Sequence, residues 1–178
     1  MGDIKDPQRV IPVVGLLTAP DFKDDLFGEL ESKTGRVLLK SEPFPFHHTT
    51  YYEQEMGSGL IRQWYAFENL VWPDALVDLK HVTNAMEMEH PNRHGGRRVN
   101  IDPGIVSLGN LVLASTKNYS HRTYLGRGIY AEVTLIFRQQ RFVPLDWTYP
   151  DYREEKALDF FTETREILKR KLAEFQEN

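Results

Sequence analysis

The sequence predicts a single α+β domain, residues 1–178, in which a mainly antiparallel sheet carries its helices chiefly on one side. The chain has 178 residues, 40% of them hydrophobic and 27% charged, values typical of one globular domain. Its first hundred residues alternate strand-like and helix-like segments in the order βαββαβ. That order is typical of a ferredoxin-like core, to which we expect the remaining residues to add a hairpin and a C-terminal amphipathic helix.

The βαββαβ order rests on apolar patterns and on residues that start or stop each element. An apolar run at 10–17 predicts a buried strand, and Pro12 favours a place near a sheet edge or a bulge. Asp21 can cap the first helix and Gly35 can end it. The remaining elements expected here are strands at 36–40, 60–71 and 97–102, an extended loop at 41–46 and a helix at 73–89.

The rest of the chain is expected to extend this sheet. Ser107 can cap a short apolar helix. At 129–138 apolar and polar residues alternate, which predicts a half-buried strand, and Gln139–Gln140 can form a tight turn that returns the chain as a hairpin. From Asp151 onward an apolar stripe at helical spacing, with charges opposite, predicts the C-terminal amphipathic helix.

Composition excludes several classes of function. The chain has no Cys, which rules out disulfides, thiolate metal sites and cysteine nucleophiles. The net charge of -4 argues against broad binding of nucleic acid or of anionic membranes. The first residues are polar, and no apolar stretch approaches the length of about 20 residues that a membrane span needs. We therefore expect a cytoplasmic protein that does not bind membranes.

Four sequence blocks stand out from the general pattern. They are residues 41–57 with Ser-Glu-Pro-Phe-Pro-Phe at their start, residues 97–104, residues 115–135, and the aromatic turn 147–152. Together they resemble an uncharacterised prokaryotic family, domain of unknown function 4416, over nearly the whole chain. The resemblance implies no catalytic residues, although some members are labelled "GTP-binding". A phosphate-binding P-loop is missing, because Lys33-Thr34 lacks the glycine that should precede it.

One candidate site lies on a predicted strand. Arg98, Asn100 and Asp102 occupy alternate positions, so their side chains should share one face. Asp102-Pro103-Gly104 is expected to end the strand and lead towards a helix start, where free backbone amides favour anions. The alternative interpretation is a solvated sheet face followed by a turn.

The first-choice site is the polar segment 115–124. It concentrates positive charge at Lys117, His121 and Arg122, without an obvious structural need. His121 is the candidate acid or base. The alternative is a solvated connection whose hydroxyls cap nearby backbone.

A third candidate face comprises Tyr130, Glu132 and Thr134, and it should place Glu132 near Arg98 or near the Lys117 segment. A structural ion pair is the alternative. The ligand site predicted from these three segments consists of Arg98, Asn100, Asp102, Lys117, Arg122, Tyr130 and Glu132, with His121 as the catalytic candidate.

Two sharper interpretations use histidine. His121-Arg122-Thr123 could pair with a motif at 47–50 as in two-histidine phosphoesterases, although we expect the two imidazoles not to face each other. His90 and His94 have metal-ligand spacing, but Pro91 breaks the helix that would align them, so no metal ligands are predicted.

The leading functional hypothesis is a site for a small phosphorylated or anionic ligand, with a nucleotide among the candidates and catalysis left open. The alternatives are a non-enzymatic interaction module that uses 41–57 and 147–152, and the phosphoesterase. Cofactors and oligomeric state are not predicted. Convergence of Arg98, Asp102, Lys117, His121, Arg122 and Glu132 in one cleft would favour the ligand site, and scattered exposure would favour the module.

Overall fold

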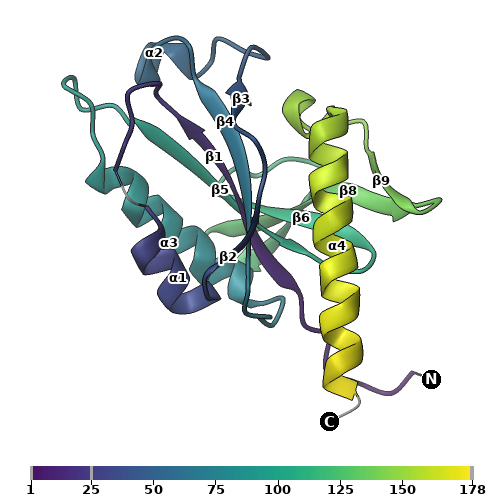
Figure 1. Cartoon of the computed structure of the whole chain (residues 1–178). Coiled ribbons are helices and arrows are strands. Elements are labelled where there is room, and N and C mark those ends of the chain that lie inside the picture. The colour runs from purple at the N-terminus through teal and green to yellow at the C-terminus, as the bar shows by residue number, and fades with distance from the viewer. Residues whose placement is uncertain (1, 25, 177–178) are drawn as a thin grey trace.

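One continuous nine-stranded sheet organises the molecule in the computed structural model, which describes residues 2–24 and 26–176 (Figure 1). The helices are α1 (Phe27–Thr34), α2 (Glu53–Met56), α3 (Ala75–Glu89), the 3-10 helix η1 (Pro150–Arg153) and α4 (Glu155–Gln176). The strands are β1 (Ile11–Thr18), β2 (Val37–Lys40), β3 (Phe44–Pro45), β4 (Ile61–Phe67), β5 (Val99–Val106), β6 (Asn110–Ser115), β7 (Arg122–Gly126), β8 (Ile129–Arg138) and β9 (Arg141–Pro144).

The strand order confirms the predicted α+β class and its ferredoxin-like core. The sheet runs β2-β4-β1-β5-β6-β8-β7, and every pairing is antiparallel. Its first four strands, with α1 and α3 as the connections, form the βαββαβ unit. The added hairpin is β8 and β9, and it turns at Gln139–Gln140, both of which have positive φ.

The helices cover both faces of the sheet, which corrects the expectation that they pack chiefly on one side. One face carries α1 and α3, and the other carries α4 (Figure 1). Alternation along β1 divides the core accordingly. Val14 and Leu16 pack with α1 and α3, whereas Ile11 and Val13 pack with α4 and with the buried Trp64.

Two expectations about the first elements are wrong in detail. β1 is a central strand between β4 and β5 rather than an edge. Pro12 is accommodated because pairing with β4 begins one residue later, at Val13. Helix α1 begins at Phe27, well after Asp21, and Leu26 is its N-cap residue. Gly35 ends the helix with φ of 76°, as predicted.

The segment after Asp102 is also corrected. β5 continues through Pro103 and Gly104 to Val106, and no helix follows. Ser107 instead forms a tight turn, in which its hydroxyl oxygen accepts hydrogen bonds from the backbone N–H groups of Gly109 and Asn110. Of the apolar residues assigned to a short helix, Leu111 and Val112 belong to β6, whereas Leu108 precedes the strand.

The sheet splits between β5 and β6. These strands pair only from Gly104 to Val106. Further along β5, the edge that would face β6 is covered by α3 instead: Glu87 accepts from the Ile101 N–H at 2.6 Å, and Lys80 donates to the Ile101 carbonyl at 3.3 Å. Pro103 lies on the same edge, two residues beyond Ile101, and has no N–H with which to extend the pairing. The split opens a path from one face of the sheet to α3.

Candidate functional site

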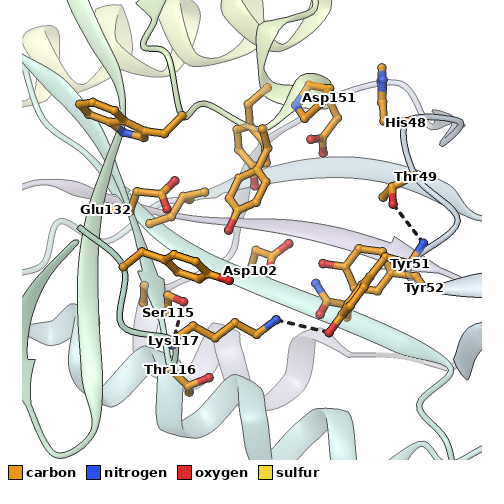
Figure 2. A pocket seen from close by; sticks show the side chains of 18 of the residues that line it. His48, Thr49, Tyr51, Tyr52, Asp102, Ser115, Thr116, Lys117, Glu132 and Asp151 are labelled. Carbon is orange, nitrogen blue, oxygen red and sulfur yellow. Dashed lines mark hydrogen bonds between the residues drawn. The ribbon is translucent and has the colours of Figure 1, made fainter. Parts of the chain in front are cut away.

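A cavity of about 710 Å³ lies at this split (Figure 2). Its walls come from β4, β5, α3, the β6–β7 connection, β8, η1 and the segment before α2. The volume falls within the range of roughly 300–1,000 Å³ that is typical of small-molecule sites.

Most of the predicted site residues line this one cavity. They are Asn100, Asp102, Lys117, His121, Arg122 and Glu132. Arg98 and Tyr130 are not among the residues that line it. Arg98 lies 3.4 Å from the Asp21 carboxylate and 5.4 Å from the Phe22 ring centroid. Tyr130 packs against Tyr124 of β7, with ring centroids 5.2 Å apart.

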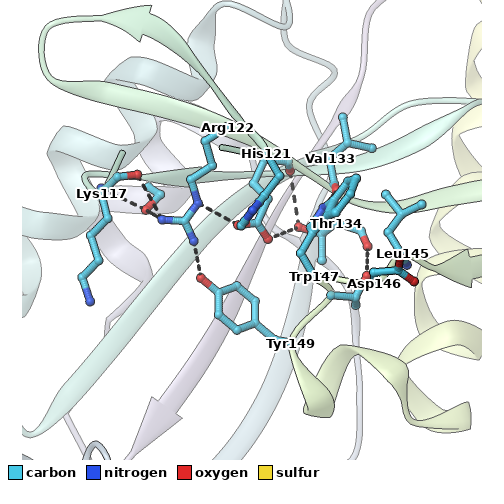
Figure 3. A network of polar contacts seen from close by, with 12 residues as sticks. Lys117, His121, Arg122, Val133, Thr134, Leu145, Asp146, Trp147 and Tyr149 are labelled. Atoms are coloured by element: carbon cyan, nitrogen blue, oxygen red, sulfur yellow. Dashed lines mark hydrogen bonds and ion pairs between the residues drawn. The ribbon is translucent and has the colours of Figure 1, made fainter. Parts of the chain in front are cut away.

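Arg122 and Glu132 form a buried ion pair at the centre of one wall (Figure 3). The Arg122 Nε donates to Glu132 at 2.7 Å, and the rest of the guanidinium bonds to Ser115, Tyr149 and the Lys117 carbonyl. Four of its five N–H donors are thereby used within the protein.

β7 begins at Arg122, so the predicted loop is shorter than expected. The alternative of a structural ion pair describes this contact, and Glu132 contacts the loop rather than Arg98.

His121 is held in a stack of three rings beside this pair. Its ring is nearly parallel to the rings of Tyr119 and Trp147, at centroid distances of 5.9 Å and 5.3 Å. Its Nε2 lies 3.1 Å from Glu132. Trp147 is itself anchored, because its Nε1 donates to the Val133 carbonyl in the gap between β7 and β9 along the edge of β8. The stack therefore fixes the imidazole plane.

Arg62 forms the centre of the second wall. It is buried on β4, and its guanidinium lies 2.8 Å from Asp151 and 3.2 Å from Asp102. Burial acts to lower the pKa of Arg62, but Asp151, Tyr152 and Asp102 outweigh it and raise that pKa overall. Burial likewise raises the pKa of the Asp151 carboxyl, against the opposing effect of Arg62. One cation thus holds two carboxylates, of which Asp102 is the more exposed.

Two tyrosines contribute hydroxyl groups next to this centre. Tyr152 is fully buried, and burial raises the pKa of its phenol well above the ordinary value. Its hydroxyl occupies the space above Gly15, where a Cβ atom would lie only 2.5 Å away. Burial, reinforced by Asp102, also raises the pKa of Tyr52. Both phenols therefore stay protonated near neutral pH and can donate hydrogen bonds.

The floor of the cavity is formed by α3 and its ion pairs. Arg97 contacts Glu87 and Glu55, each at 2.8 Å, and donates to the Asn100 side-chain oxygen at 3.0 Å. Burial raises the pKa of Glu87 despite Lys80 and Arg97. Lys80 is 7% exposed, and its only hydrogen bond within the described chain is to the Ile101 carbonyl.

The mouth is bridged by Lys117 and Tyr51. The Lys117 Nζ donates to the Tyr51 hydroxyl at 3.3 Å and lies 5.1 Å from that ring's centroid (Figure 2). His48 lines the same cavity, and its Nε2 lies 2.6 Å from Glu154. His48 and His121 thus share a cavity, but each directs Nε2 to a glutamate. This arrangement does not supply the two free imidazoles that the phosphoesterase hypothesis needs.

A family model matches most of the chain. The model of the domain of unknown function DUF4416 covers residues 7–168. The chain belongs to the DUF4416 family. It has no match among curated proteins or among solved structures.

Several residues of this DUF4416 cavity were missed from the sequence. Arg62, Lys80, Tyr52 and Tyr152 all line it. A usable signal was present for the two cations: Arg62 interrupts an otherwise apolar and aromatic strand, and Lys80 lies on the buried stripe of α3. A charged residue at a core position indicates either a buried ion pair or a functional site.

The described residues of this DUF4416 chain contain neither a metal-ligand cluster nor a membrane-spanning helix. Within residues 2–24 and 26–176, no group of three or more His, Asp or Glu side chains is arranged to hold a metal ion. His90 instead contacts Asp24 at 3.0 Å, just beyond the end of α3. Over the same residues, no helix has the length and apolar character to cross a membrane.

Proposed function

We propose that this DUF4416 domain binds a small phosphorylated metabolite, a nucleotide or a sugar phosphate, in the cavity between β5 and β6. The observation that carries the proposal is Lys80. It is a buried ammonium group with no carboxylate oxygen within 4 Å among the described residues. A buried charge is costly unless it is paired, and Glu87, the carboxylate that interacts with Lys80, is shared with Arg97, so an anionic ligand would stabilise Lys80 further.

The pairing of the other cations supports this assignment. Arg62, Arg97 and Arg122 line the cavity, but each already contacts a carboxylate. Lys117 resembles Lys80, because within the described chain its Nζ contacts the Tyr51 hydroxyl and no carboxylate. The two lysines are therefore the cations available to a phosphate, whereas Arg122 holds the wall in place. Arg122 was predicted to bind the ligand, and we instead assign it the role of positioning the cavity wall.

The convergence of residues also favours a ligand site over an interaction module. Six residues were expected to converge in one cleft if the protein has a ligand site. Five of them line one cavity, and Arg98 is the exception. The aromatic residues at its mouth, Tyr51, Tyr119, Trp147 and Tyr149, offer ring faces against which a base or sugar can pack. The proposal concerns binding and assigns no reaction, and His121 stays the candidate acid or base.

Calorimetric titration with AMP, ribose 5-phosphate and pyrophosphate tests this function. We expect at least one probe to bind, and Lys80→Met and Lys117→Met each to weaken it about tenfold or more, equivalent to about 1.4 kcal/mol. Lys80→Met should fold, because replacing a buried charge with an apolar side chain of similar volume is often neutral or stabilising.

The matched control is Lys169→Met, at an exposed position on α4 away from the cavity, which should bind as wild type does. Absence of binding by all three probes would overturn the proposal. So would equal affinities for wild type, both cavity variants and the control. Either result would favour the interaction module formed by 41–57 and 147–152.

A further inference from the structure

Two deeply buried polar side chains of the cavity each carry a hydrogen-bond donor for which no described residue supplies an acceptor. They are the Asn100 Nδ2 and the Tyr152 O–H, and their residues are 6% and 1% exposed. The Trp64 indole N–H interacts with the Tyr152 hydroxyl, but it can only donate to the oxygen. Asn100 and Tyr152 both line the cavity. Because more than about 90% of buried polar groups in native proteins are paired, these two groups indicate a bound molecule.

Asp102 lies between them. It is two residues beyond Asn100 on the same face of β5, and it lies opposite Gly15, above which the Tyr152 hydroxyl rests. Arg62 holds one carboxylate oxygen of Asp102 at 3.2 Å. The other oxygen has no hydrogen bond from any described residue, and 26% of the side chain remains exposed. Figure 2 shows Asp102 near the middle of the cavity.

The charge of Asp102 disfavours a phosphate directly beside it. A phosphate next to Asp102 would bring two negative charges together. Sugar hydroxyls fit instead, because each one both donates and accepts. They can donate to the free oxygen of Asp102 and accept from the Asn100 amide and the Tyr152 phenol.

We propose that Asp102, Asn100 and Tyr152 bind a vicinal diol, so that the ligand is a phosphorylated ribose or a related sugar rather than a deoxy sugar. This inference rests on the proposed function, in which Lys80 and Lys117 hold the phosphate. The cavity then has two chemically distinct sets of groups. Lys80 on the floor and Lys117 at the mouth present cations that form no ion pair, and β5 presents a carboxylate flanked by donors.

The test compares two ligand pairs by calorimetric titration. They are ribose 5-phosphate against 2-deoxyribose 5-phosphate, and AMP against 2′-deoxy-AMP. We expect the deoxy member of a pair that binds to be at least tenfold weaker with wild type, because the site's polar groups lose a partner. In Asp102→Asn and in Tyr152→Phe this discrimination should fall to less than about threefold.

Tyr152→Phe removes a hydroxyl whose O–H donates to no described residue, so this variant should fold, and its melting temperature separates lost recognition from lost folding. Equal affinity for both members of each pair would overturn the diol assignment and leave phosphate binding intact. Unchanged discrimination in both variants would overturn the residue assignment. If D-ribose bound as tightly as ribose 5-phosphate, the diol site would stand and the phosphate site would fail. No binding by any of these probes would overturn both.

Discussion

At the scale of single residues, Gly15 determines how closely the centre of the site can pack. It lies in the middle of β1 with an ordinary extended backbone, so conformational freedom does not explain a glycine here. Space does, because a Cβ would lie 2.5 Å from the Tyr152 hydroxyl and 3.1 Å from the Arg62 guanidinium. The glycine therefore lets Tyr152 and Arg62 approach the strand.

We expect Gly15→Ala to destabilise the protein by about 1–3 kcal/mol, the usual cost of overpacking a core. Urea denaturation measures the change. Gly28→Ala is the control: no atom lies within 4 Å of the added Cβ, and alanine favours a helix. Tyr152→Phe should restore much of the loss in the double variant, since it removes the closest atom. An equal loss with and without the Tyr152 hydroxyl would contradict this explanation.

Individual site residues were predictable only where polar side chains were conspicuous in the sequence. Lys117 and His121 stand in a polar segment, and they line the cavity. Alternation in the sequence predicts that Arg98 shares a face with Asn100. Arg98 precedes β5, however, so strand alternation does not apply to it. Tyr152 fits the pattern of an ordinary core aromatic, because the residues that surround its hydroxyl are far apart in the sequence.

At the scale of elements, α2 depends on tertiary contacts. A helix of four residues has no stability of its own. Arg97 holds it by two hydrogen bonds of 2.8 Å to the Glu55 carboxylate, whose oxygen also accepts from the Arg97 backbone N–H. This clamp positions the segment that supplies Tyr51 and Tyr52 to the cavity.

The clamp makes stability depend on pH. The hydrogen bond from Arg97 lowers the pKa of Glu55 below its ordinary value, against the effect of burial. A lowered pKa in the folded state means that the stabilisation is present above the unfolded-state pKa and is lost as the pH falls through the folded-state pKa. Glu55→Gln should therefore lose less stability than wild type on acidification.

Urea denaturation between neutral pH and about pH 3 measures this difference, since ordinary glutamate titrates near 4.3. Glu68→Gln serves as the matched control, because its carboxylate meets the exposed Arg36 at 3.4 Å on the surface. It should retain the wild-type acid dependence. Parallel curves for Glu55→Gln and wild type would show that the clamp contributes nothing to acid sensitivity.

The element predictions failed where a short apolar run fits two periodicities. Residues 108–114 suit one face of a helix as well as a buried strand. The turn at Gly109-Asn110 favours the strand, because it places the following residues beside the edge of β5, with which they pair. By contrast, 129–138 was long enough for its alternation to be read correctly, although its polar members Glu132 and Thr134 proved to be buried.

At the scale of the whole molecule, two cores share one sheet. Leu30 of α1 belongs to the core on one face, and Trp64 belongs to the core under α4 on the other. β1 and β4 contribute side chains to both cores. The two layers of helices therefore cannot lose their packing independently.

We expect Leu30→Ala to lower the unfolding midpoint identically by far-UV circular dichroism and by tryptophan fluorescence, with a loss of about 2–5 kcal/mol. The fluorescence includes Trp64, on the face opposite the substitution, so coincidence shows one cooperative unit. Met88→Ala, at an exposed site of α3, should stay within about 0.5 kcal/mol of wild type. Two separate transitions in Leu30→Ala would contradict the shared core.

The overall topology could be predicted because helix and strand periodicities occur in the order of a known arrangement. The placement of α4 could not, because an amphipathic helix fits either face of a sheet that is apolar on both. The cavity was equally hidden. It arises where two strands part, and that depends on register rather than on local composition.

The parting of β5 from β6 has a consequence for comparing relatives of this chain. Pro103 offers no amide at the position where the ladder would continue, so backbone chemistry contributes to the opening together with the Glu87 and Lys80 side chains that bond Ile101 on the same edge. A homologue with an ordinary residue here could close the two strands together and lose the chamber while keeping every side chain that lines it. The presence of this proline should therefore mark relatives that share the chamber, whereas the proposed ligand binding also requires the lysines that line it.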